Sequence, residues 1–419
     1  MFSQTARKFR KKCQNSQPYF EITRRSATIC ISISIIWDNY QNKYLYLRGY
    51  RDYDMPVLEK LVISDFRNIA LQEVEFSPNV NCISGNNGEG KTNLLDAIYY
   101  MSMTKSAFAS SDRFALRHGA EEFALSGTYR MENGTTSRFA MKMTSKGEKK
   151  VRRDDKPYPK IAEHIGVLPV VMVSPADVSM VSESGEERRR FVNAVLSQMS
   201  REYMSALQQY NRLLLQRNRM LKDLNPDRSL LEVIDMRMAA VAAPVYQARK
   251  EFVENLKPIV SEYYRNLSGG SEQVDIRYET ELDNMPLEEL LSSSYEKDRI
   301  MKHTTEGIHR DDFVFTMNGH PIRRYGSQGQ QKSFLVSLKF AQYEIMKRNY
   351  GFAPMLLLDD VFDKLDMNRI SNLLQMVASN DFGQIFITDS NKVRMSGIVD
   401  RLTKDRAYFE TVSGTFTRQ

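Results

Sequence analysis

The chain has 419 residues, a formal net charge of +7 and a pI near 9.0. That length allows two or three domains around a large core. Residues 1–55 contain ten Lys or Arg and four Asp or Glu, which accounts for +6 and leaves residues 56–419 close to neutral. Net charge therefore gives no argument for a nucleic-acid partner, and only local basic patches could do so.

Cysteine usage and hydropathy exclude further classes of protein. The three cysteines, Cys13, Cys30 and Cys82, show neither metal-binding spacing nor the pairing of a disulfide framework. We therefore expect a reducing, cytoplasmic setting. No apolar run reaches the roughly 18–20 residues that a membrane helix needs, so we expect no membrane partner.

The first 54 residues admit three interpretations. The apolar run "ATICISISIIW" (27–37) follows basic residues, as in a targeting segment, but no small-residue cleavage site comes after it. A genuine basic tail is the second interpretation. We favour a third, in which translation starts at Met55, because the organised apolar pattern begins directly after it. Residues 1–54 would then be a basic extension outside the native protein.

The organised part begins with "VLEKLVISDFRNIALQEVEFS" (57–77), whose alternation predicts two strands joined near "FRN". "NVNCIS" (79–84) predicts a short buried strand. "TNLLDAIYYM" (92–101) predicts a helix with Leu94 and Ile98 on one face. The glycine-rich stretch "SGNNGEGKT" lies where this strand passes into this helix.

That stretch fits G-x-x-x-x-G-K-[ST], the Walker A loop, in which successive backbone N–H groups surround phosphate oxygens. Lys91 would reach the β- and γ-phosphates of ATP, and the Thr92 hydroxyl would ligate Mg²⁺. The helix N-terminus adds a partial positive charge. A turn that matches by chance is the alternative, which the strand–loop–helix context disfavours. The expected nucleotide contacts are Gly85, Asn86, Asn87, Gly88, Glu89, Gly90, Lys91 and Thr92.

The middle of the chain changes from strands to helices. "EFALSGTYRMENGTTSRFAMKMTS" predicts a hairpin that turns at Asn133–Gly134. "KKVRRDDKPY" predicts a strand pair or a mobile basic loop, and "GVLPVVMVSP" a buried strand. From about residue 186 to 264, apolar residues recur every three or four positions, and "NPDRS" divides them into two long helices. Pro244 and Pro258 are expected to kink the second helix.

After these helices, strands and helices alternate. "QVDIRYETEL" and "DDFVFTMNGHPIRR" predict strands, and "QQKSFLVSLKFAQYEIMKR" predicts a helix. "APMLLLDDVFD" predicts a buried strand, "DMNRISNLLQMVA" a helix and "GQIFITDS" a strand. This alternation indicates a parallel α/β sheet.

"MLLLDD" (355–360) fits a Walker B strand, which is apolar and ends in two acids. Ligands of open α/β sheets bind at the carboxyl ends of the strands, where Asp359 would emerge to hold Mg²⁺ through a water. Asp360 would polarise the attacking water, with Lys91 as the second catalytic group. The alternative is a strand that simply ends in surface acids.

"YGSQGQQKS" (325–333) resembles the signature motif of ABC-type ATPases, and "KLD" after the Walker B strand resembles their D-loop. The resemblance implies that Ser327 and Gly329 of one protomer contact the γ-phosphate held by the other, with Asp366 nearby. This chain has "ITDSN" where many of these ATPases carry a switch histidine. It also has Asp360 where they carry a glutamate, so slow hydrolysis is expected.

Finer matches run through nearly the whole chain beyond Met55. They include "LVISDFRNI", "VSPADVSMVSESGEERRRFVNAVLSQ", "QYNRLLLQRNRML", "GIHRDDF" and "NGHPIRRYGSQGQQKS". These segments, in order, resemble the RecF family of bacterial recombination proteins, which are SMC-like ABC-type ATPases. By this resemblance Arg67 matches the "FRN" arginine that approaches the nucleotide. His309 and Arg310 match the "HRDD" segment without an assignable role, and a structural histidine is the simpler interpretation.

The resemblance implies an ABC-type α/β head, built from an antiparallel β subdomain and a parallel α/β sheet, with an inserted helical arm. The expected head segments are residues 55–180 and 271–419, and the expected arm is residues 181–270, an antiparallel helical pair. It further implies an ATP-dependent homodimer that binds single-strand/double-strand DNA junctions with RecR and RecO. Such a dimer would help load RecA in gap repair and the SOS response.

Two functions from different classes therefore stay open. One is a DNA-binding switch ATPase, and the other is a mechanical or transport ABC subunit without DNA contact. The long helical insertion favours the first. Basic residues that could meet a DNA backbone form two groups, and each could equally be a solvated face: Lys149, Lys150, Arg152 and Arg153, and Arg188, Arg189 and Arg190.

Overall fold

The computed structural model describes residues 55–131, 133–183, 185–223, 226–270, 272–363, 366, 369–373, 382–392, 397, 403 and 405–419. The chain divides into two compact units, Met1–Asp52 and Tyr53–Gln419, and the fold below is that of the second. The hypotheses about residues 1–54 lie outside the described residues. Within the described part, no helix is both long and apolar enough to cross a membrane.

The first sheet is antiparallel throughout. Its strands in spatial order are β2 (Ile69–Glu75), β1 (Val57–Phe66), β4 (Glu122–Arg130), β5 (Thr136–Thr144), β6 (Lys149–Arg153) and β7 (Lys156–Pro157). The predicted hairpins at "FRN" and at Asn133–Gly134 are confirmed, and "KKVRRDDKPY" forms a strand pair. Buried residues alternate along β4 and β5, so one face of this sheet lies on a core.

The second sheet carries the nucleotide motifs. Its strands in spatial order are β15 (Thr415–Arg418), β14 (Arg406–Val412), β3 (Val80–Ser84), β13 (Ile385–Asp389), β12 (Met355–Asp359) and β8 (Val170–Val173). All neighbours pair in parallel except the β14–β15 hairpin. Strands β3, β12 and β13 are buried at every position, as expected for a sheet covered on both faces. The predicted parallel α/β sheet is confirmed.

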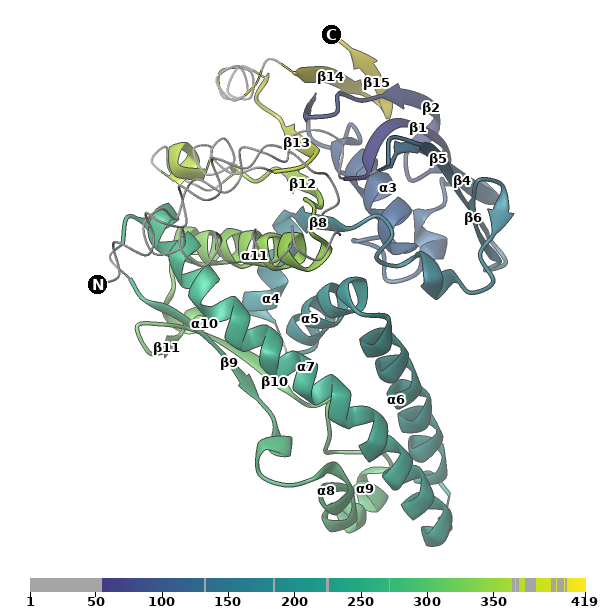
Figure 1. Cartoon of the computed structure of the whole chain (residues 1–419), viewed down its shortest axis with the longest axis vertical. Coiled ribbons are helices and arrows are strands. Elements are labelled where there is room, and N and C mark those ends of the chain that lie inside the picture. The colour runs from purple at the N-terminus through teal and green to yellow at the C-terminus, as the bar shows by residue number, and fades with distance from the viewer. Residues whose placement is uncertain are drawn as a thin grey trace, which may run out of the picture. The chain divides into compact units, whose positions relative to one another are not determined.

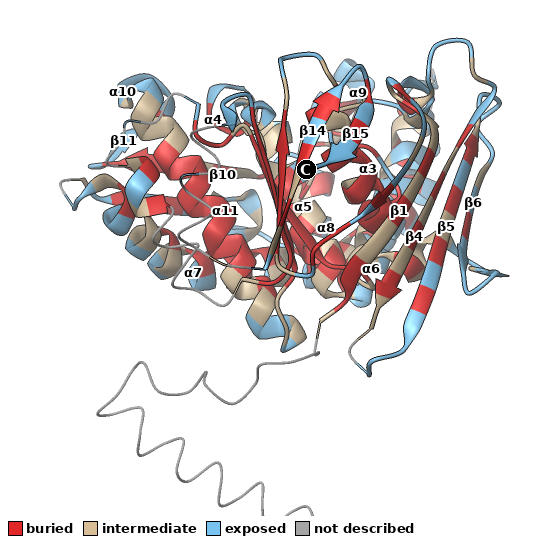
Figure 2. Cartoon of the chain, turned by 90° about the horizontal axis from the view of Figure 1, so that it is seen from above, coloured by how far each residue is buried: buried red, intermediate tan, exposed pale blue. Residues whose placement is uncertain are grey.

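This second sheet separates two hydrophobic cores. Along β12, Leu356 and Leu358 face one core and Leu357 faces the other, because successive side chains of a strand point to opposite faces. Helix α3 (Lys91–Met103) fills the core between the two large sheets, as Figure 2 shows. Helix α11 (Gln328–Tyr350) contributes to the core on the opposite face.

A third, small sheet and several short elements complete the described fold. The sheet is antiparallel, with the order β11 (His320–Pro321), β10 (Asp312–Met317) and β9 (Val274–Glu279). The short helices are α4 (Ser179–Ser182), α8 (Leu287–Ser293), α9 (Tyr295–Met301) and α10 (Ile322–Tyr325). Single 3-10 turns occupy Asp112–Ala115, Ile161–His164, Pro175–Val178 and Glu281–Asp283.

The predicted pair of long helices is formed by α6 (Arg201–Met220) and α7 (Arg228–Ser268), which lie side by side in Figure 1. They are antiparallel, since Arg217 near the end of α6 pairs with Asp235 near the start of α7. Helix α7 continues through Pro244 and Pro258 as one uninterrupted helix.

One sequence-based expectation about these helices is wrong. The spacing of the first apolar run predicts a single helix, but the chain forms α5 (Gly185–Met199) and then starts α6. Ser200 separates them as the N-cap of α6, where its Oγ accepts a hydrogen bond from the Tyr203 N–H at 3.0 Å. Sequence reasoning also left α8, α9 and the β14–β15 hairpin unpredicted.

Candidate functional site

The parallel register of the second sheet brings the two Walker motifs together. In this register Asp359 of β12 lies beside Thr388 of β13, and Asp389 of β13 lies beside Ser84 of β3. The loop of residues 85–90 follows Ser84 directly. The Walker A loop and both acids of "LLLDD" therefore emerge at the same carboxyl edge of the sheet, where ligands of such sheets bind.

Two glycines of the Walker A loop sit where a side chain would collide with backbone or a neighbouring amide. Gly90 is the N-cap of α3 with a φ of 111°, and a Cβ there would lie 2.8 Å from the Asn68 Oδ1. A Cβ on Gly85 would lie 2.6 Å from the Thr411 carbonyl oxygen. Glycine thus lets the loop close against its neighbours and present its backbone to a ligand.

Lys91 lies inside the curve of this loop and is buried. Its Nζ donates hydrogen bonds to the carbonyl oxygens of Gly85, at 2.8 Å, and Asn86, at 3.0 Å. The ammonium group is therefore held by oxygen acceptors of its own loop. Phosphate oxygens are stronger acceptors for a cation and could replace these carbonyls.

A chain of hydroxyl–carboxylate bonds connects the two motifs. The Thr92 hydroxyl lies 3.0 Å from both carboxylate oxygens of Asp359. The Thr388 hydroxyl donates to Asp359 Oδ1 at 2.7 Å and accepts from the Asp360 N–H at 3.0 Å. Burial raises the pKa of the Asp359 carboxyl, so a nearby cation would favour its ionised form.

This arrangement fits a magnesium ion held jointly with phosphates. A hydroxyl and a carboxylate are the hard oxygen ligands that Mg²⁺ takes. Two neighbouring ligands of an octahedral ion with bonds of about 2.1 Å stand about 3 Å apart, close to the separation of Thr92 and Asp359. No group of three or more His, Cys, Asp or Glu that could hold a metal occurs among the described residues, so substrate or water would supply the other ligands.

Asp360 ends the strand in a left-handed conformation, with a φ of 43°. This turns the chain away from β12 and leaves the side chain half-buried. Burial raises the pKa of its carboxyl, while Lys91 acts in the opposite direction. The Lys332 Nζ donates to the Asp360 carbonyl oxygen at 3.3 Å, which joins α11 to the Walker B segment of the same chain.

The signature residues lie at the exposed N-terminus of α11. Ser327 is the N-cap and forms a capping box with Gln330, whose N–H it accepts at 3.2 Å. A Cβ on Gly329 would lie 2.5 Å from the Arg369 guanidinium. Asp366 is exposed and accepts the Arg369 N–H at 2.9 Å. The described hydrogen bonds of Ser327 are thus to its own helix and not to the Walker A loop of its own chain.

The "FRN" turn contacts both the Walker A helix and the Walker A loop, and the expected approach of Arg67 to a nucleotide stays a prediction. The Arg67 guanidinium is bonded to Asp96 of α3, at 3.1 and 2.8 Å, and to the Ser106 hydroxyl at 2.8 Å. The neighbouring Asn68 is the residue that contacts the loop, and it donates to the Glu89 carbonyl oxygen at 3.3 Å. Sequence reasoning missed Asn68, although it is part of the same quoted motif.

The β14–β15 turn is a second contact that sequence reasoning missed. The Gly414 N–H donates to the Glu89 carbonyl oxygen at 2.8 Å, and the Ser413 N–H donates to the Glu89 carboxylate. The C-terminal hairpin therefore supports the phosphate loop from outside. The adjacency of a β-hairpin and a loop so distant in the chain has no local sequence signal.

The two groups of basic residues differ in their availability. Arg188 forms two bonds with Asp312, at 2.8 and 2.9 Å, so its charge is used within the fold. Lys149 pairs with Asp112. Lys149 begins β6, and further along the same strand Lys150 and Arg152 are exposed and available to a partner.

Comparison with known proteins agrees with this geometry. The chain matches the family described as RecF/RecN/SMC N terminal domain over residues 57–404. The DNA replication and repair protein RecF of Parabacteroides distasonis is 42% identical over 358 residues, which cover 85% of this chain and 98% of that protein. The protein of the same name from Porphyromonas gingivalis strain ATCC 33277 is 41% identical over 359 residues, 85% of this chain and 99% of that protein.

Solved structures place the fold in the same group. A structure of the recombination mediator protein RecF-ATP in the RecFOR pathway superposes with a TM-score of 0.80 at 29% identity, covering 89% of this chain and all of that one. The Smc head domain of Pyrococcus furiosus shares the fold, with a TM-score of 0.53 at 16% identity, 87% of this chain and 96% of that one. The chain belongs to the RecF family of DNA replication and repair proteins.

Proposed function

We propose that this chain is a DNA-binding switch ATPase of recombinational gap repair and the SOS response. It binds ATP and Mg²⁺ at the carboxyl edge of the second sheet and dimerises around two nucleotides. The dimer holds single-strand/double-strand DNA junctions in the cytoplasm and, with RecR and RecO, helps load RecA. One observation carries the proposal: Lys91 is bonded to loop carbonyls that phosphate oxygens could replace, and beside it Thr92 and Asp359 lie 3.0 Å apart, as two ligands of one cation would.

The residues at this edge of the sheet would have different roles in binding and hydrolysing ATP. Lys91 and the loop N–H groups bind the phosphates, and Thr92 with Asp359 holds the cation. A γ-phosphate held by the Walker A loop of one protomer would meet the signature residues of the other, and a cation on Thr92 and Asp359 would neutralise part of its charge. Asp360 orients and polarises water. Its side chain is one methylene shorter than the glutamate usual in ABC-type ATPases, so its carboxylate reaches less far toward the attacking water and turnover is slow.

Dimerisation follows from the position of the signature motif. Ser327 and Gly329 lie at the exposed start of a 23-residue helix, whose N-terminus carries a partial positive charge suited to an anion. Their hydrogen bonds are within their own helix, so the second phosphate-binding half of each site has to come from another copy. A two-fold dimer would complete both sites at once.

DNA binding measured with and without ATP across protein concentrations tests this function. We expect affinity for a junction oligonucleotide to rise with ATP and to depend cooperatively on protein concentration. DNA should also stimulate ATP turnover. Binding that is independent of ATP, together with turnover that is independent of DNA, would favour a mechanical ABC ATPase without DNA contact.

A further inference from the structure

A cleft of about 750 Å³ lies between the C-terminal end of α3, helices α5 and α6, and the loop of residues 303–310. Its volume falls within the roughly 300–1,000 Å³ of known ligand sites. None of the residues of the Walker A loop, Asp359 or Asp360 lines it. The cleft is therefore separate from the nucleotide site.

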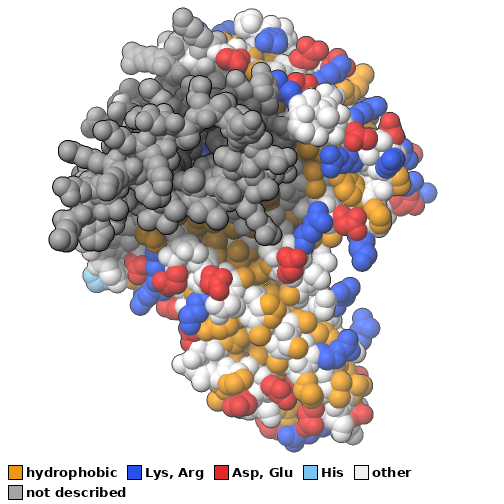
Figure 3. Space-filling model, viewed as in Figure 1, with side chains coloured by type: hydrophobic (Ala, Val, Ile, Leu, Met, Phe, Trp, Pro, Cys, Tyr) orange, Lys and Arg blue, Asp and Glu red, His pale blue; other side chains and the backbone are white. Residues whose placement is uncertain are grey.

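The cleft has an excess of positive charge. Five cations line it, namely Lys105, Arg189, Arg190, Arg249 and Arg310, and Glu186 is the one carboxylate among its described lining residues. Glu186 forms an ion pair with Arg190 at 3.3 Å. Lys105 and Arg310 are exposed and form no ion pair with any other described residue. Figure 3 shows further Lys and Arg side chains along the side of the arm on which α6 lies.

Lys105 in particular carries a charge that the fold does not balance. Desolvation by the walls of the cleft and the neighbouring charge of Arg190 lower the pKa of its ammonium group; Asp112 acts in the opposite direction, and Lys149 adds a smaller lowering. A bound anion would relieve this repulsion. The lining of the cleft and the unbalanced charge of Lys105 therefore both indicate a negatively charged ligand.

The loop that carries Arg310 is held rigidly. The His309 Nε2–H donates to the Thr304 carbonyl oxygen at 3.1 Å, and the Tyr210 hydroxyl donates to Nδ1 at 2.9 Å. Burial lowers the pKa of His309 to about 4, so the ring is neutral and structural. The Arg249 guanidinium donates to the Ile308 carbonyl oxygen at 2.7 Å. Arg310 is thus presented on a fixed loop, which reduces the entropy lost on binding.

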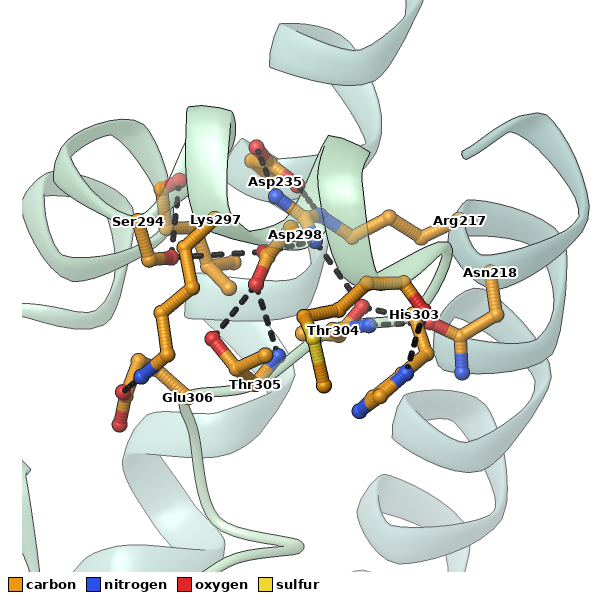
Figure 4. A network of polar contacts seen from close by, with 12 residues as sticks. Arg217, Asn218, Asp235, Ser294, Lys297, Asp298, His303, Thr304, Thr305 and Glu306 are labelled. Carbon is orange, nitrogen blue, oxygen red and sulfur yellow. Dashed lines mark hydrogen bonds and ion pairs between the residues drawn. The ribbon is translucent and has the colours of Figure 1, made fainter. Parts of the chain in front are cut away.

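The uncharged lining favours a sugar–phosphate backbone. Asn218 Oδ1 accepts from both the N–H and the hydroxyl of Thr304, at 2.7 Å each, so its amide nitrogen remains as a donor and is turned away from Thr304 in Figure 4. Gln208 and Asn211 add further amides. Of the aromatic rings in the described lining, Tyr210 is fully buried and His309 is held by two hydrogen bonds, so the partly exposed His303 is the one ring available for base stacking.

We propose that this cleft binds the phosphodiester backbone of one nucleic-acid strand through Lys105, Arg310 and the amides of α6. Amides and cations that outnumber the single partly exposed ring suit contacts that hold phosphates and sugars irrespective of sequence. The volume is that of a drug-sized ligand, which admits a short stretch of one strand and not a duplex. This inference rests on the proposed DNA-binding function and names a site for the single-stranded part of the junction.

The cleft is connected to the Walker A helix. Thr104, the C-cap of α3, precedes Lys105, and Ser106 follows it. The Ser106 hydroxyl is bonded to Asp96 of α3, at 2.8 Å, and to Arg67, at 2.8 Å. A strand held by Lys105 therefore engages the end of the helix that begins at Lys91, about 20 Å away along the helix axis. Any effect of the strand on ATP affinity must equal the effect of ATP on strand affinity.

Fluorescence anisotropy of labelled oligonucleotides, titrated with salt, tests the cleft. The full-length variants are Lys105→Met and Arg310→Gln, with Arg348→Gln as the control, because it removes the same charge from an exposed residue near the end of α11. We expect each cleft variant to lower single-strand affinity roughly threefold to tenfold and the salt slope by about 0.7. A duplex of equal length should lose less. Circular dichroism and the thermal midpoint confirm that each variant is folded.

Several outcomes would overturn the assignment. In one of them, both cleft variants bind the single strand with the same salt slope as Arg348→Gln, and the parent still binds DNA. The proposed function would then stand, but DNA would not bind at this cleft. Equal losses for strand and duplex would contradict the single-strand assignment. A polyglutamate peptide that binds as tightly as the strand and depends on the same two residues would assign the cleft to an acidic protein segment. A parent protein without any DNA binding would contradict the proposed function itself.

Discussion

The nucleotide edge of the second sheet and the interior between helices α6, α7 and α9 use similar charged and hydroxyl groups in different surroundings. Arg217 of α6 is fully buried and is bonded to Asp235 of α7 at 2.6 Å, to Asp298 of α9 at 2.6 Å and to the Thr304 hydroxyl at 2.9 Å; these four residues are called the arm network below (Figure 4). At the sheet edge, Lys91 is bonded to two carbonyl oxygens of a loop that is itself largely exposed. The arm network is enclosed, whereas the sheet edge opens on solvent.

This difference separates a structural from a functional use of charge. A buried arginine with two carboxylates and a hydroxyl cannot exchange its partners, because any loss leaves an uncompensated charge in the interior. The contacts of Lys91 and Thr92 can be exchanged, because a phosphate or a cation would supply stronger partners from the open side. Changes to the free energy of unfolding should therefore be large in the arm and small at the sheet edge.

The largest expected effect on the free energy of unfolding comes from Arg217→Met. It leaves Asp235 and Asp298 buried without their cation, which should lower the free energy of unfolding by about 3–5 kcal/mol. Chemical denaturation measures this change, and Arg219→Met on the same helix is a control at a neighbouring arginine. A loss below about 1 kcal/mol would show that the arm network is not the structural element described here.

An intermediate effect on the free energy of unfolding is expected from replacing the buried His164. Burial lowers the pKa of His164 to about 4, while its Nε2 bonds the Met101 carbonyl oxygen at 2.7 Å. The folded pKa lies below the unfolded value of 6.5. The contribution of the neutral His164 ring to the free energy of unfolding is therefore complete above pH 6.5 and is lost as the pH falls toward 4. Each such histidine contributes a slope of at most about 1.4 kcal/mol per pH unit. His164→Gln should reduce the slope measured by denaturation between pH 6.5 and 5, and an unchanged slope would contradict its neutral state.

The smallest effect on stability is expected from Lys91→Met. The two released carbonyls lie in a loop open to water, so the free energy of unfolding should change by less than about 1 kcal/mol. ATP affinity, measured by isothermal titration calorimetry, should nevertheless fall severely, because the charge that neutralises the phosphates is gone. Unchanged ATP affinity in the folded variant would remove the assignment of the Walker A site.

Local patterns in the sequence were sufficient for the elements that depend on neighbouring residues. The Walker loops are defined by glycine, lysine and acid spacing, and the hairpin at Asn133–Gly134 by its turn residues, so both were predicted with the correct strands around them. The start of α6 was missed because the apolar period continues across Ser200, although a serine N-cap was the available signal.

Contacts between distant segments could not be predicted from one sequence. The sequence makes Arg188 a candidate for DNA contact, but a bond to Asp312, 124 residues away, neutralises its charge within the fold. Asn68 contacts the Walker A loop through a turn whose arginine was the more conspicuous residue. The role of His309 followed only from its two partners, Tyr210 and Thr304, on different elements.

Light scattering with ATP tests the central proposal, that two chains close over two nucleotides, most directly. The parent should convert from monomer to dimer when ATP is added and return as ATP is hydrolysed, and Asp360→Asn should remain dimeric. Ser327→Arg should bind ATP with near-normal affinity, because it leaves the Walker A loop intact, yet stay monomeric and fail to hydrolyse ATP. A Ser327→Arg protein that dimerises and turns over ATP like the parent would contradict the account and leave only a P-loop nucleotide site.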